Sequence, residues 1–255
     1  MKRTRLAMWE WALILALVLL SWGLRVCLPA QVPPGWRDDE LINILALTGQ
    51  VLESGPTIYF TGASGHEPLY HVLHAPVVAL VGLNPMGAHL LSIVSGVLAV
   101  PLTYVLGRRL FSRGAGLLGA ALLVSSFWAL MYSRTAIRHA LVVPFALAAF
   151  YFLWRAAEGR WLRHALAAGL ALTGALLTYT VSRMMLALLP AFGLYLLLFH
   201  RERFRRWWRP LLVALLMAGV LTTPMWLAIA RGRSEAAAQG IGADARISEL
   251  ARPLQ

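Results

Sequence analysis

The chain has 255 residues, of which 59% are hydrophobic and only 13% are charged, and its formal net charge is +12 at pH 7. Soluble globular domains are about half apolar and about a quarter charged, so this composition indicates a protein embedded in a lipid bilayer. The basic residues form short clusters between long apolar runs. That pattern orients membrane helices, and it excludes nucleic-acid binding as the explanation of the charge.

The first predicted element is a transmembrane helix over residues 8–28. Its apolar run of about 20 residues is long enough to cross a bilayer, and no small-residue cleavage motif follows it. We therefore interpret it as a retained anchor and not as a signal peptide. Cys27 lies near the end of this run, and as the only cysteine it excludes an intrachain disulfide.

Six more stretches downstream are apolar and long enough to be transmembrane helices. Gly, Ser and Thr recur in several of them, and such small residues let membrane helices approach closely. The sequence shows no alternation typical of strands, so the predicted fold is an all-α polytopic membrane protein with about seven transmembrane helices. The six stretches are residues 88–107, 114–133, 139–156, 163–182, 184–200 and 210–230.

The stretch 67–83 is apolar but short, and it contains Pro68 and Pro76. The basic residues indicate its place, because cytoplasmic loops are enriched in Lys and Arg. With seven spans and a cytoplasmic N-terminus, 14 of the 23 Lys and Arg lie inside, whereas an eighth span at 67–83 leaves only 10 inside. We therefore expect 67–83 to lie as a helix on the outer surface of the membrane. Residues 29–87 then form one outer loop, and the polar tail 231–255 lies outside as well.

Three consecutive acidic residues, Asp38, Asp39 and Glu40, open the first helical segment of this outer loop. The apolar residues that follow repeat at helical spacing and end at Gly55-Pro56, which predicts an amphipathic helix on the membrane surface. Asp38 suits the N-cap of this helix, and the other two carboxylates suit its positive end. A role in chemistry stays open for the pair Asp39-Glu40.

The second surface segment contains His66 and Glu67, which look like the start of a zinc-protease motif. That motif requires H-E-x-x-H, but His71 lies five residues after His66 with a proline between them, so we exclude it. Glu67, His71 and His74 nevertheless fall on one helical face, an arrangement suited to a divalent cation. The alternative is that they are ordinary histidines at the membrane interface.

Basic residues gather where spans three and four meet on the outer side, in the stretch YSRTAIRHALVVPF. Arg138 and His139 occupy the predicted first turn of span four, and Arg134 is nearby in sequence. A cation is unfavourable at a helix N-terminus unless an anion joins it, and both the free amides and a guanidinium attract phosphate. Arg183, in the short outer turn TYTVSRMM, is a weaker case of the same kind. Anchoring to lipid headgroups is the alternative for these arginines.

The D-E pair, GHEPLY, GRRLFSRGAG and YSRTAIR, in this order, resemble the GT-C glycosyltransferases of the protein-mannosyltransferase and aminoarabinose-transferase type. The resemblance covers residues 1–230 and implies a multi-pass enzyme of the cell membrane that works on the outer face. Its donor would be a sugar on a polyprenyl phosphate, and its acceptor a lipid, a glycan or a protein. Members are usually longer, so the tail 231–255 would be the start of a further loop.

The family pattern also implies roles for particular residues. The first acid of the D-E pair is catalytic in the family, and it corresponds to Asp39, with Glu40 beside it. In the aminoarabinose branch a Glu in the segment equivalent to GHEPLY helps to bind a divalent metal. His66, followed by Glu67, stands at that position here, so a divalent ion is the cofactor that the resemblance suggests. An Asp that this branch carries before span four corresponds to His139.

These observations predict a membrane glycosyltransferase in which Asp39 is the general base and Glu40 positions it. Arg138, with Arg134 and Arg183, is expected to bind the phosphate of the donor. Two other functions stay as alternatives, namely a transporter and a non-catalytic membrane scaffold. A transporter tends to carry ionisable groups near mid-membrane, whereas the acid closest to a predicted span here is Glu10, at its inner edge.

Overall fold

The computed structural model describes residues 7–31, 35–61, 65–159 and 161–238, with the backbone alone over 233–238. Most of the tail predicted at 231–255 therefore lies outside the described residues. Within this part of the chain the protein is built from helices, and its one β-interaction is an isolated bridge between Phe60 and His66. The all-α membrane fold predicted from the sequence is confirmed.

The helices are named here in chain order, with short 3-10 or π segments marked η. The N-terminal half contains α1 (Met8–Val26), α2 (Asp38–Leu41), η1 (Ile42–Thr48), α3 (Gly49–Ser54), α4 (Leu69–Val81), α5 (Pro85–Leu110), α6 (Arg113–Ser125) and α7 (Phe127–Ser133). The C-terminal half contains η2 (Arg138–Leu141), α8 (Val142–Glu158), α9 (Trp161–Leu176), η3 (Thr180–Arg183), α10 (Met184–Phe199) and α11 (Arg201–Ala238).

Five helical stretches are long and apolar enough to cross a membrane, namely α1, α5, η2 with α8, η3 with α10, and α11. The pair α6 and α7 makes a sixth candidate if it is counted as one span. The predicted span 163–182 is occupied by α9, whose 16 residues fall short of the roughly 20 that a bilayer requires. The described helices thus support five or six crossings by length and composition, and the predicted seventh stays a prediction.

The α6/α7 pair is bent by 60°, at Ser125-Ser126 in the middle of the predicted span 114–133. The Ser125 hydroxyl bonds back to the carbonyl of Ala121, and the Ser126 hydroxyl accepts a hydrogen bond from the amide of Ala129 at 3.4 Å. Ser126 therefore begins a new helix, and serines that compete for backbone partners in this way are a known cause of kinks.

Small residues bring α5 and α6 close together. A Cβ on Gly116 would lie 2.7 Å from both the Arg108 amide nitrogen and the Tyr104 carbonyl oxygen, so only glycine fits there. The largest core cluster lies among α8, α9, α10 and α11 and is rich in alanine and leucine. Its buried members are Ala149, Leu153, Ala168, Ala171, Leu172, Ala175, Leu176, Met185, Leu189, Leu211, Ala214 and Ala218.

Glu10 links α1 to α5 and α6 through hydrogen bonds and ion pairs. Its carboxylate is fully buried, accepts a hydrogen bond from the Tyr104 hydroxyl, and pairs with the Arg108 guanidinium at 3.0 Å and the Arg113 guanidinium at 3.6 Å. The carboxylate also accepts the Ala7 amide, which caps the start of α1. These partners at the end of the bundle explain why a buried carboxylate is present at position 10. The transporter alternative therefore gains no support from Glu10.

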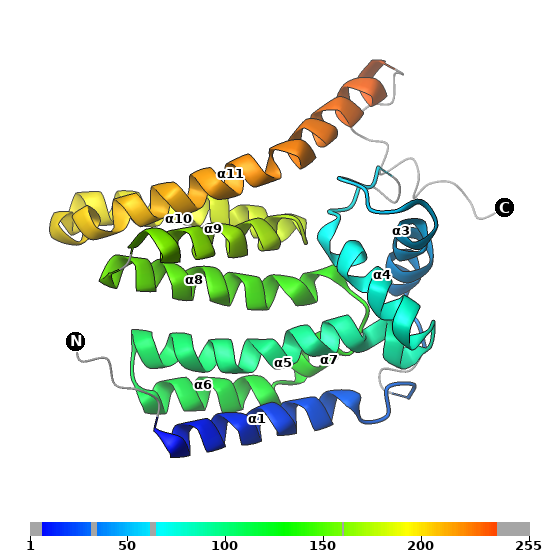
Figure 1. Ribbon diagram of the computed structural model, residues 1–255, viewed down its shortest axis with the longest axis horizontal. Coiled ribbons are helices and arrows are strands. Elements are labelled where there is room, and N and C mark those ends of the chain that lie inside the picture. The colour runs from blue at the N-terminus through cyan, green and yellow to red at the C-terminus, as the bar shows by residue number, and fades with distance from the viewer. Residues whose placement is uncertain (1–6, 32–34, 62–64, 160, 239–255) are drawn as a thin grey trace.

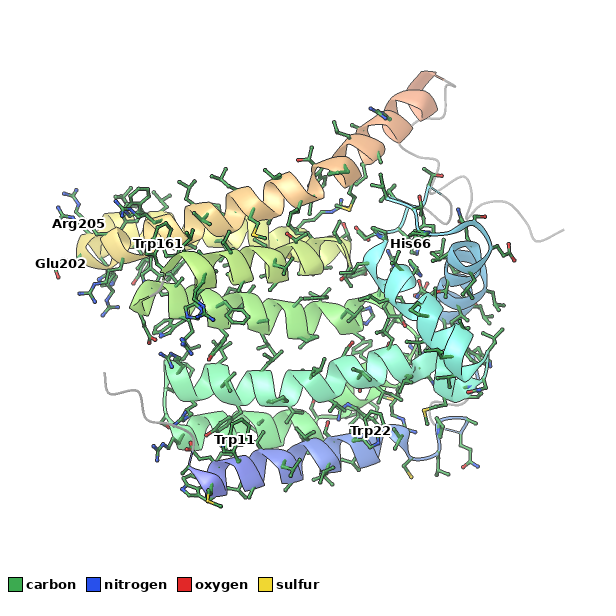
Figure 2. All side chains as sticks on the ribbon, viewed as in Figure 1. Trp11, Trp22, His66, Trp161, Glu202 and Arg205 are labelled. Carbon is green, nitrogen blue, oxygen red and sulfur yellow. The ribbon has the colours of Figure 1, made fainter. Side chains whose placement is uncertain are left out.

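The long helices lie side by side, and α3 and α4 cross one end of the bundle (Figure 1). We call this the surface-helix end, and it also carries the segments 134–141 and 177–183. Figure 2 shows His66 at this end and Trp161, Glu202 and Arg205 at the opposite end. With 13 residues, α4 is too short to cross a bilayer, as predicted for 67–83.

Candidate active site

The acidic run begins the first surface helix, but Asp38 is not its N-cap. Arg37 holds that position, and Asp38 is the first helical residue. The capping is done by Glu40, whose side chain accepts a hydrogen bond from the Arg37 amide at 3.1 Å. A glutamate at the third helical position commonly reaches back in this way. The prediction that Asp38 caps the helix is therefore wrong, because the helix begins one residue earlier than the spacing indicated.

Glu40 is fully buried and links three segments of the chain. Its Oε1 accepts hydrogen bonds from His89 Nε2 of α5 at 3.1 Å and from the Ala136 amide at 2.8 Å. Burial by itself raises the pKa of Glu40, but the hydrogen bonds donated by His89, Ala136 and Arg37 outweigh it and hold the pKa below its ordinary value. Glu40 thus has no atom exposed to a substrate, and its hydrogen bonds position the start of the surface helix.

His89 was missed by the sequence reasoning, which placed it within the predicted span 88–107 and assigned it no role. It lies in the first turns of α5, is nearly buried, and also packs against the Trp36 ring at 5.5 Å between ring centroids. A histidine at the beginning of an apolar run was the available signal. Its partner lies 49 residues away, so the sequence could not identify the pair.

Asp39 lies exposed beside this buried anchor. It is close enough to Arg138 and His139, at the start of the 138–158 span, to interact with both electrostatically. The helix after it continues as the π segment η1, in which Asn43 Nδ2 donates to the Ala136 carbonyl at 2.9 Å. Such π segments are frequent at functional sites. The structure therefore brings the D-E pair and the Arg138 segment together.

Glu67 joins two arginines from different loops. Its Oε2 accepts from Arg138 Nη1 at 3.0 Å, and its Oε1 accepts from Arg183 Nη2 at 2.7 Å. The Arg138 guanidinium also lies over the Tyr179 ring, and the Arg183 guanidinium over the Trp226 ring of α11, at 5.2 Å and 4.9 Å from the ring centroids. We call Glu67, Arg138 and Arg183 the arginine clamp.

The local backbone fixes Glu67 in this place. The bridge between Phe60 and His66 closes the preceding loop, and the Leu69 amide at the start of α4 donates to the Leu177 carbonyl at 2.9 Å. Gly65 has a φ of +86°, and a Cβ there would overlap the Tyr59 hydroxyl, so glycine is required. The glutamate is thereby held between α4 and the loop that carries Arg183.

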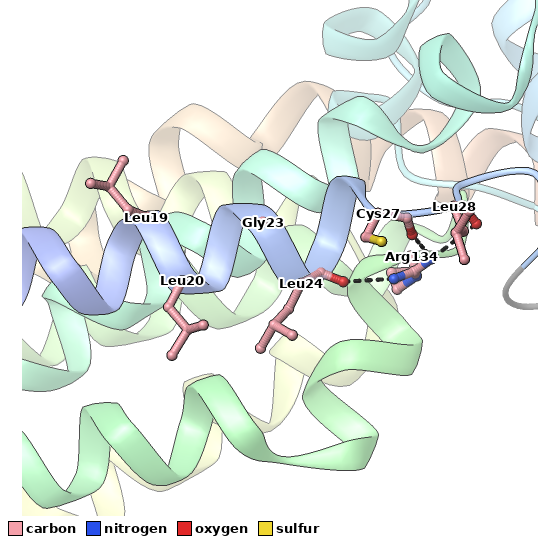
Figure 3. A pocket seen from close by; sticks show the side chains of 7 residues that line it. All are labelled: Leu19, Leu20, Gly23, Leu24, Cys27, Leu28 and Arg134. Atoms are coloured by element: carbon pink, nitrogen blue, oxygen red, sulfur yellow. Dashed lines mark hydrogen bonds between the residues drawn. The ribbon is translucent and has the colours of Figure 1, made fainter.

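Two of the three arginines predicted to bind phosphate are in the clamp, and the third is elsewhere. Arg134 donates from Nη1 to the Leu24 carbonyl at 2.6 Å and from Nη2 to the carbonyls of Cys27 and Leu28. It therefore caps the C-terminal end of α1. Arg134 also lines an apolar groove of about 520 Å³ together with Leu19, Leu20, Gly23, Leu24, Cys27 and Leu28. Figure 3 shows these residues along α1, with Arg134 at the C-terminal end of the helix.

The predicted metal ligands do not fit a metal ion in this arrangement. Both oxygens of Glu67 already pair with arginines, and no group of three or more His, Cys, Asp or Glu in the described residues is placed to hold an ion. His74 is buried and bonds to the Ala88 carbonyl and the Thr48 hydroxyl. Burial and the nearby Arg138 lower the pKa of His71 to about 3, so its ring is neutral.

Residues 65–226 match the model of the dolichyl-phosphate-mannose-protein mannosyltransferase family. The chain belongs to this family. The match includes Glu67, Arg138, Arg183 and Trp226, whereas Asp39 and Glu40 precede it. The recognition of a GT-C glycosyltransferase family from the sequence is confirmed, and no match was found among the curated proteins.

Solved structures of an archaeal oligosaccharyltransferase from Archaeoglobus fulgidus share the fold of this family member. AglB in complex with an inhibitory peptide and a dolichol-phosphate has a TM-score of 0.68 at 15% identity, over 85% of this chain and 29% of that one. The apo form has a TM-score of 0.64 at 15% identity, over 92% and 35%. The complex with Zn and sulfate gives 0.63 at 15%, over 90% and 37%. The chain thus spans about a third of these proteins.

Proposed function

We propose that this protein transfers a sugar from a polyprenyl-phosphate-linked donor to a lipid, glycan or protein acceptor on the outer face of the cell membrane. The observation that carries the proposal is the arginine clamp, with exposed Asp39 within electrostatic range of Arg138. The family description names a dolichyl-phosphate-linked sugar, and one similar structure contains a dolichol-phosphate, which supports this class of donor.

The clamp has the charge and the donors that a phosphate leaving group needs. Its two guanidiniums and one carboxylate leave one net positive charge, and each arginine spends one nitrogen on Glu67. The Nε of Arg183 is buried and has no hydrogen-bond partner within the described part of the chain. Guanidiniums held in place before the reaction stabilise the charge that develops on a departing phosphate.

Asp39 is the proposed general base. It accepts the proton of an acceptor hydroxyl or amine while that group attacks the anomeric carbon of the sugar. The bond from the anomeric carbon to the phosphate oxygen breaks, and its electron pair leaves with the polyprenyl phosphate against Arg138 and Arg183. Glu40 fixes the helix that carries Asp39. No step requires a metal ion held by His66 or Glu67.

The arrangement of charged segments supports the proposed location of the reaction. Asp39, Glu67, Arg138 and Arg183 belong to the segments at the surface-helix end and interact with one another there. Arg205 and Glu202 lie at the opposite end (Figure 2). Because cytoplasmic loops are enriched in Lys and Arg, we assign the opposite end to the cytoplasm and the site to the outer face.

A transfer assay tests this function. The protein, expressed in its full natural length, is incubated with a panel of labelled polyprenyl-phosphate hexoses and pentoses and with membranes as the source of acceptors. We expect label to move from one donor to an acceptor in the wild type, and turnover to collapse in Asp39→Asn. Release of label at the same rate with the wild type, Asp39→Asn and protein-free membranes would overturn the proposal.

A further inference from the structure

A continuous series of aromatic rings leads from the bent α6/α7 pair to the arginine clamp. Each ring contacts the next, with centroid separations between 4.9 and 5.8 Å, and the last ring lies under the Arg138 guanidinium. We call this series the aromatic run. In order from the middle of the bent pair, its members are Phe127, Trp128, Tyr132, His139 and Tyr179.

The two ends of the aromatic run lie in different surroundings. Phe127 and Trp128 are each 65% exposed, and Tyr132 is 43% exposed, although they belong to a candidate membrane span. They follow the 13 residues of α6, which cover about 20 Å of a hydrocarbon core of about 30 Å. The first rings therefore face lipid in the half of the bilayer near the surface-helix end, while Tyr179 lies beside a charged cluster.

An ordinary aromatic belt does not explain this arrangement. Belt residues are tryptophans and tyrosines at headgroup level that need no contact with one another. Here the bend at Ser126 turns α7 away from the line of α6, and its rings continue without a break into His139 and Tyr179. A ligand that follows these rings would have an apolar chain in the bilayer and an anionic group at Arg138.

We propose that the aromatic run binds the isoprenoid chain of the donor, with the phosphate on Arg138 and Arg183. This inference rests on the proposed function and adds the path of the lipid. Flat rings offer large contact areas that lose little conformational entropy, and the methyl groups and double bonds of an isoprenoid pack against such faces. Charge complementarity at the polar end fixes the direction of the chain, because a phosphate is attracted to the clamp.

The experiment compares two lipids in binding titrations with the full chain in detergent or nanodiscs. Undecaprenyl phosphate has a much longer isoprenoid chain than geranyl phosphate. If the chain follows the ring-to-ring contacts from Arg138, we expect the short chain to end before Trp128 and the long one to pass it. We expect Trp128→Leu to lower the affinity for undecaprenyl phosphate about 3- to 10-fold, as for the loss of a favourable aromatic contact. The affinity for geranyl phosphate should be unchanged. Trp22→Leu is the matched control, because Trp22 is 40% exposed on α1 and lies outside the run.

Arg138→Gln separates this inference from the function on which it rests. Suppose that Arg138→Gln lowers the affinity for both lipids, while Trp128→Leu has no more effect than the control Trp22→Leu. The isoprenoid chain then does not follow the aromatic run, although the clamp still binds the phosphate. If Trp128→Leu weakens both lipids equally, the ring acts on the clamp and not on the chain, and the inference is also wrong. If Arg138→Gln leaves both affinities unchanged, the clamp is not a donor site and the proposed function itself fails.

Discussion

Replacing Glu67 by Gln should weaken donor binding by about tenfold. The substitution keeps the size of the side chain but removes the charge that holds Arg138 and Arg183 together. Breaking a fully buried ion pair costs about 3–5 kcal/mol. The arginine side chains are 15% and 29% exposed, and solvent screening reduces the cost for such groups. We therefore expect about 1–2 kcal/mol, which corresponds to roughly a tenfold change in affinity.

The direction of this effect depends on which side of the arginines the phosphate occupies. Glu67 itself is only 3% exposed, whereas the Arg138 and Arg183 side chains are 15% and 29% exposed. We therefore expect the phosphate to approach from the more exposed side of the clamp, so that the carboxylate organises the two arginines without occupying the phosphate position. Loss of that organisation outweighs the gain in net positive charge, because two unpaired guanidiniums repel each other and lose their fixed orientation.

Titration with undecaprenyl phosphate measures the change, with Glu158→Gln as the control. Glu158 also accepts from an arginine, Arg109, but the pair is exposed at the opposite end of the bundle. Exposed pairs contribute about 0–1 kcal/mol, so donor affinity should be unchanged in the control. Tighter binding in Glu67→Gln would show that the carboxylate competes with the phosphate, and would refute its role in organising the two arginines for the donor.

Three further predictions concern the base, the buried anchor and the topology. Asp39→Asn should lower single-turnover transfer by about 10²–10⁴-fold, whereas Asp38→Asn should stay near the wild type, and the reverse order would identify the wrong carboxylate. Because the pKa of Glu40 is held below its ordinary 4.5, its stabilising effect is complete above that pH and is lost as pH falls through the lower folded value. Thermal unfolding should therefore depend less on pH below 4.5 in Glu40→Gln than in the wild type, and equal slopes would contradict the anchor. In a cysteine-free background, Ser54→Cys should react with an impermeant thiol reagent in intact cells, whereas Ser112→Cys should not. Labelling of Ser112→Cys from outside would show that the predicted topology is wrong.

The helices and the neighbourhood of the site were accessible from the sequence because both depend on local patterns. Apolar runs of membrane length located the long helices, and the short run at 67–83 forms α4 at the surface-helix end. The bend at Ser125-Ser126 was missed, because a continuous apolar run does not reveal where hydroxyl groups will compete with the backbone. The N-cap was assigned to Asp38 instead of Arg37 for a similar reason, because the sequence pattern does not show which of two neighbouring residues begins the helix.

Ion pairs between residues far apart in the chain could not be predicted from the sequence. The sequence assigned Glu67 to a metal site and Arg138 and Arg183 to phosphate, but the pairing of the carboxylate with both arginines joins positions 71 and 116 residues apart. Arg134 was grouped with Arg138 because they are close in sequence. The turn between them directs Arg134 to the end of α1 and Arg138 to the clamp.

Glu40 gives a physical reason why the proposed catalytic residue, Asp39, lies next to a buried carboxylate. An exposed aspartate in the first turn of a surface helix would by itself vary in position, whereas general-base catalysis depends on close placement of the reacting groups. Glu40 follows Asp39 directly, and its hydrogen bond from the Ala136 amide holds the backbone two residues before Arg138. One buried carboxylate thus sets the separation between the proposed base and the proposed phosphate-binding group. In the proposed mechanism the two adjacent acids therefore act as an anchored base, in which exposed Asp39 carries out the chemistry and buried Glu40 fixes its position.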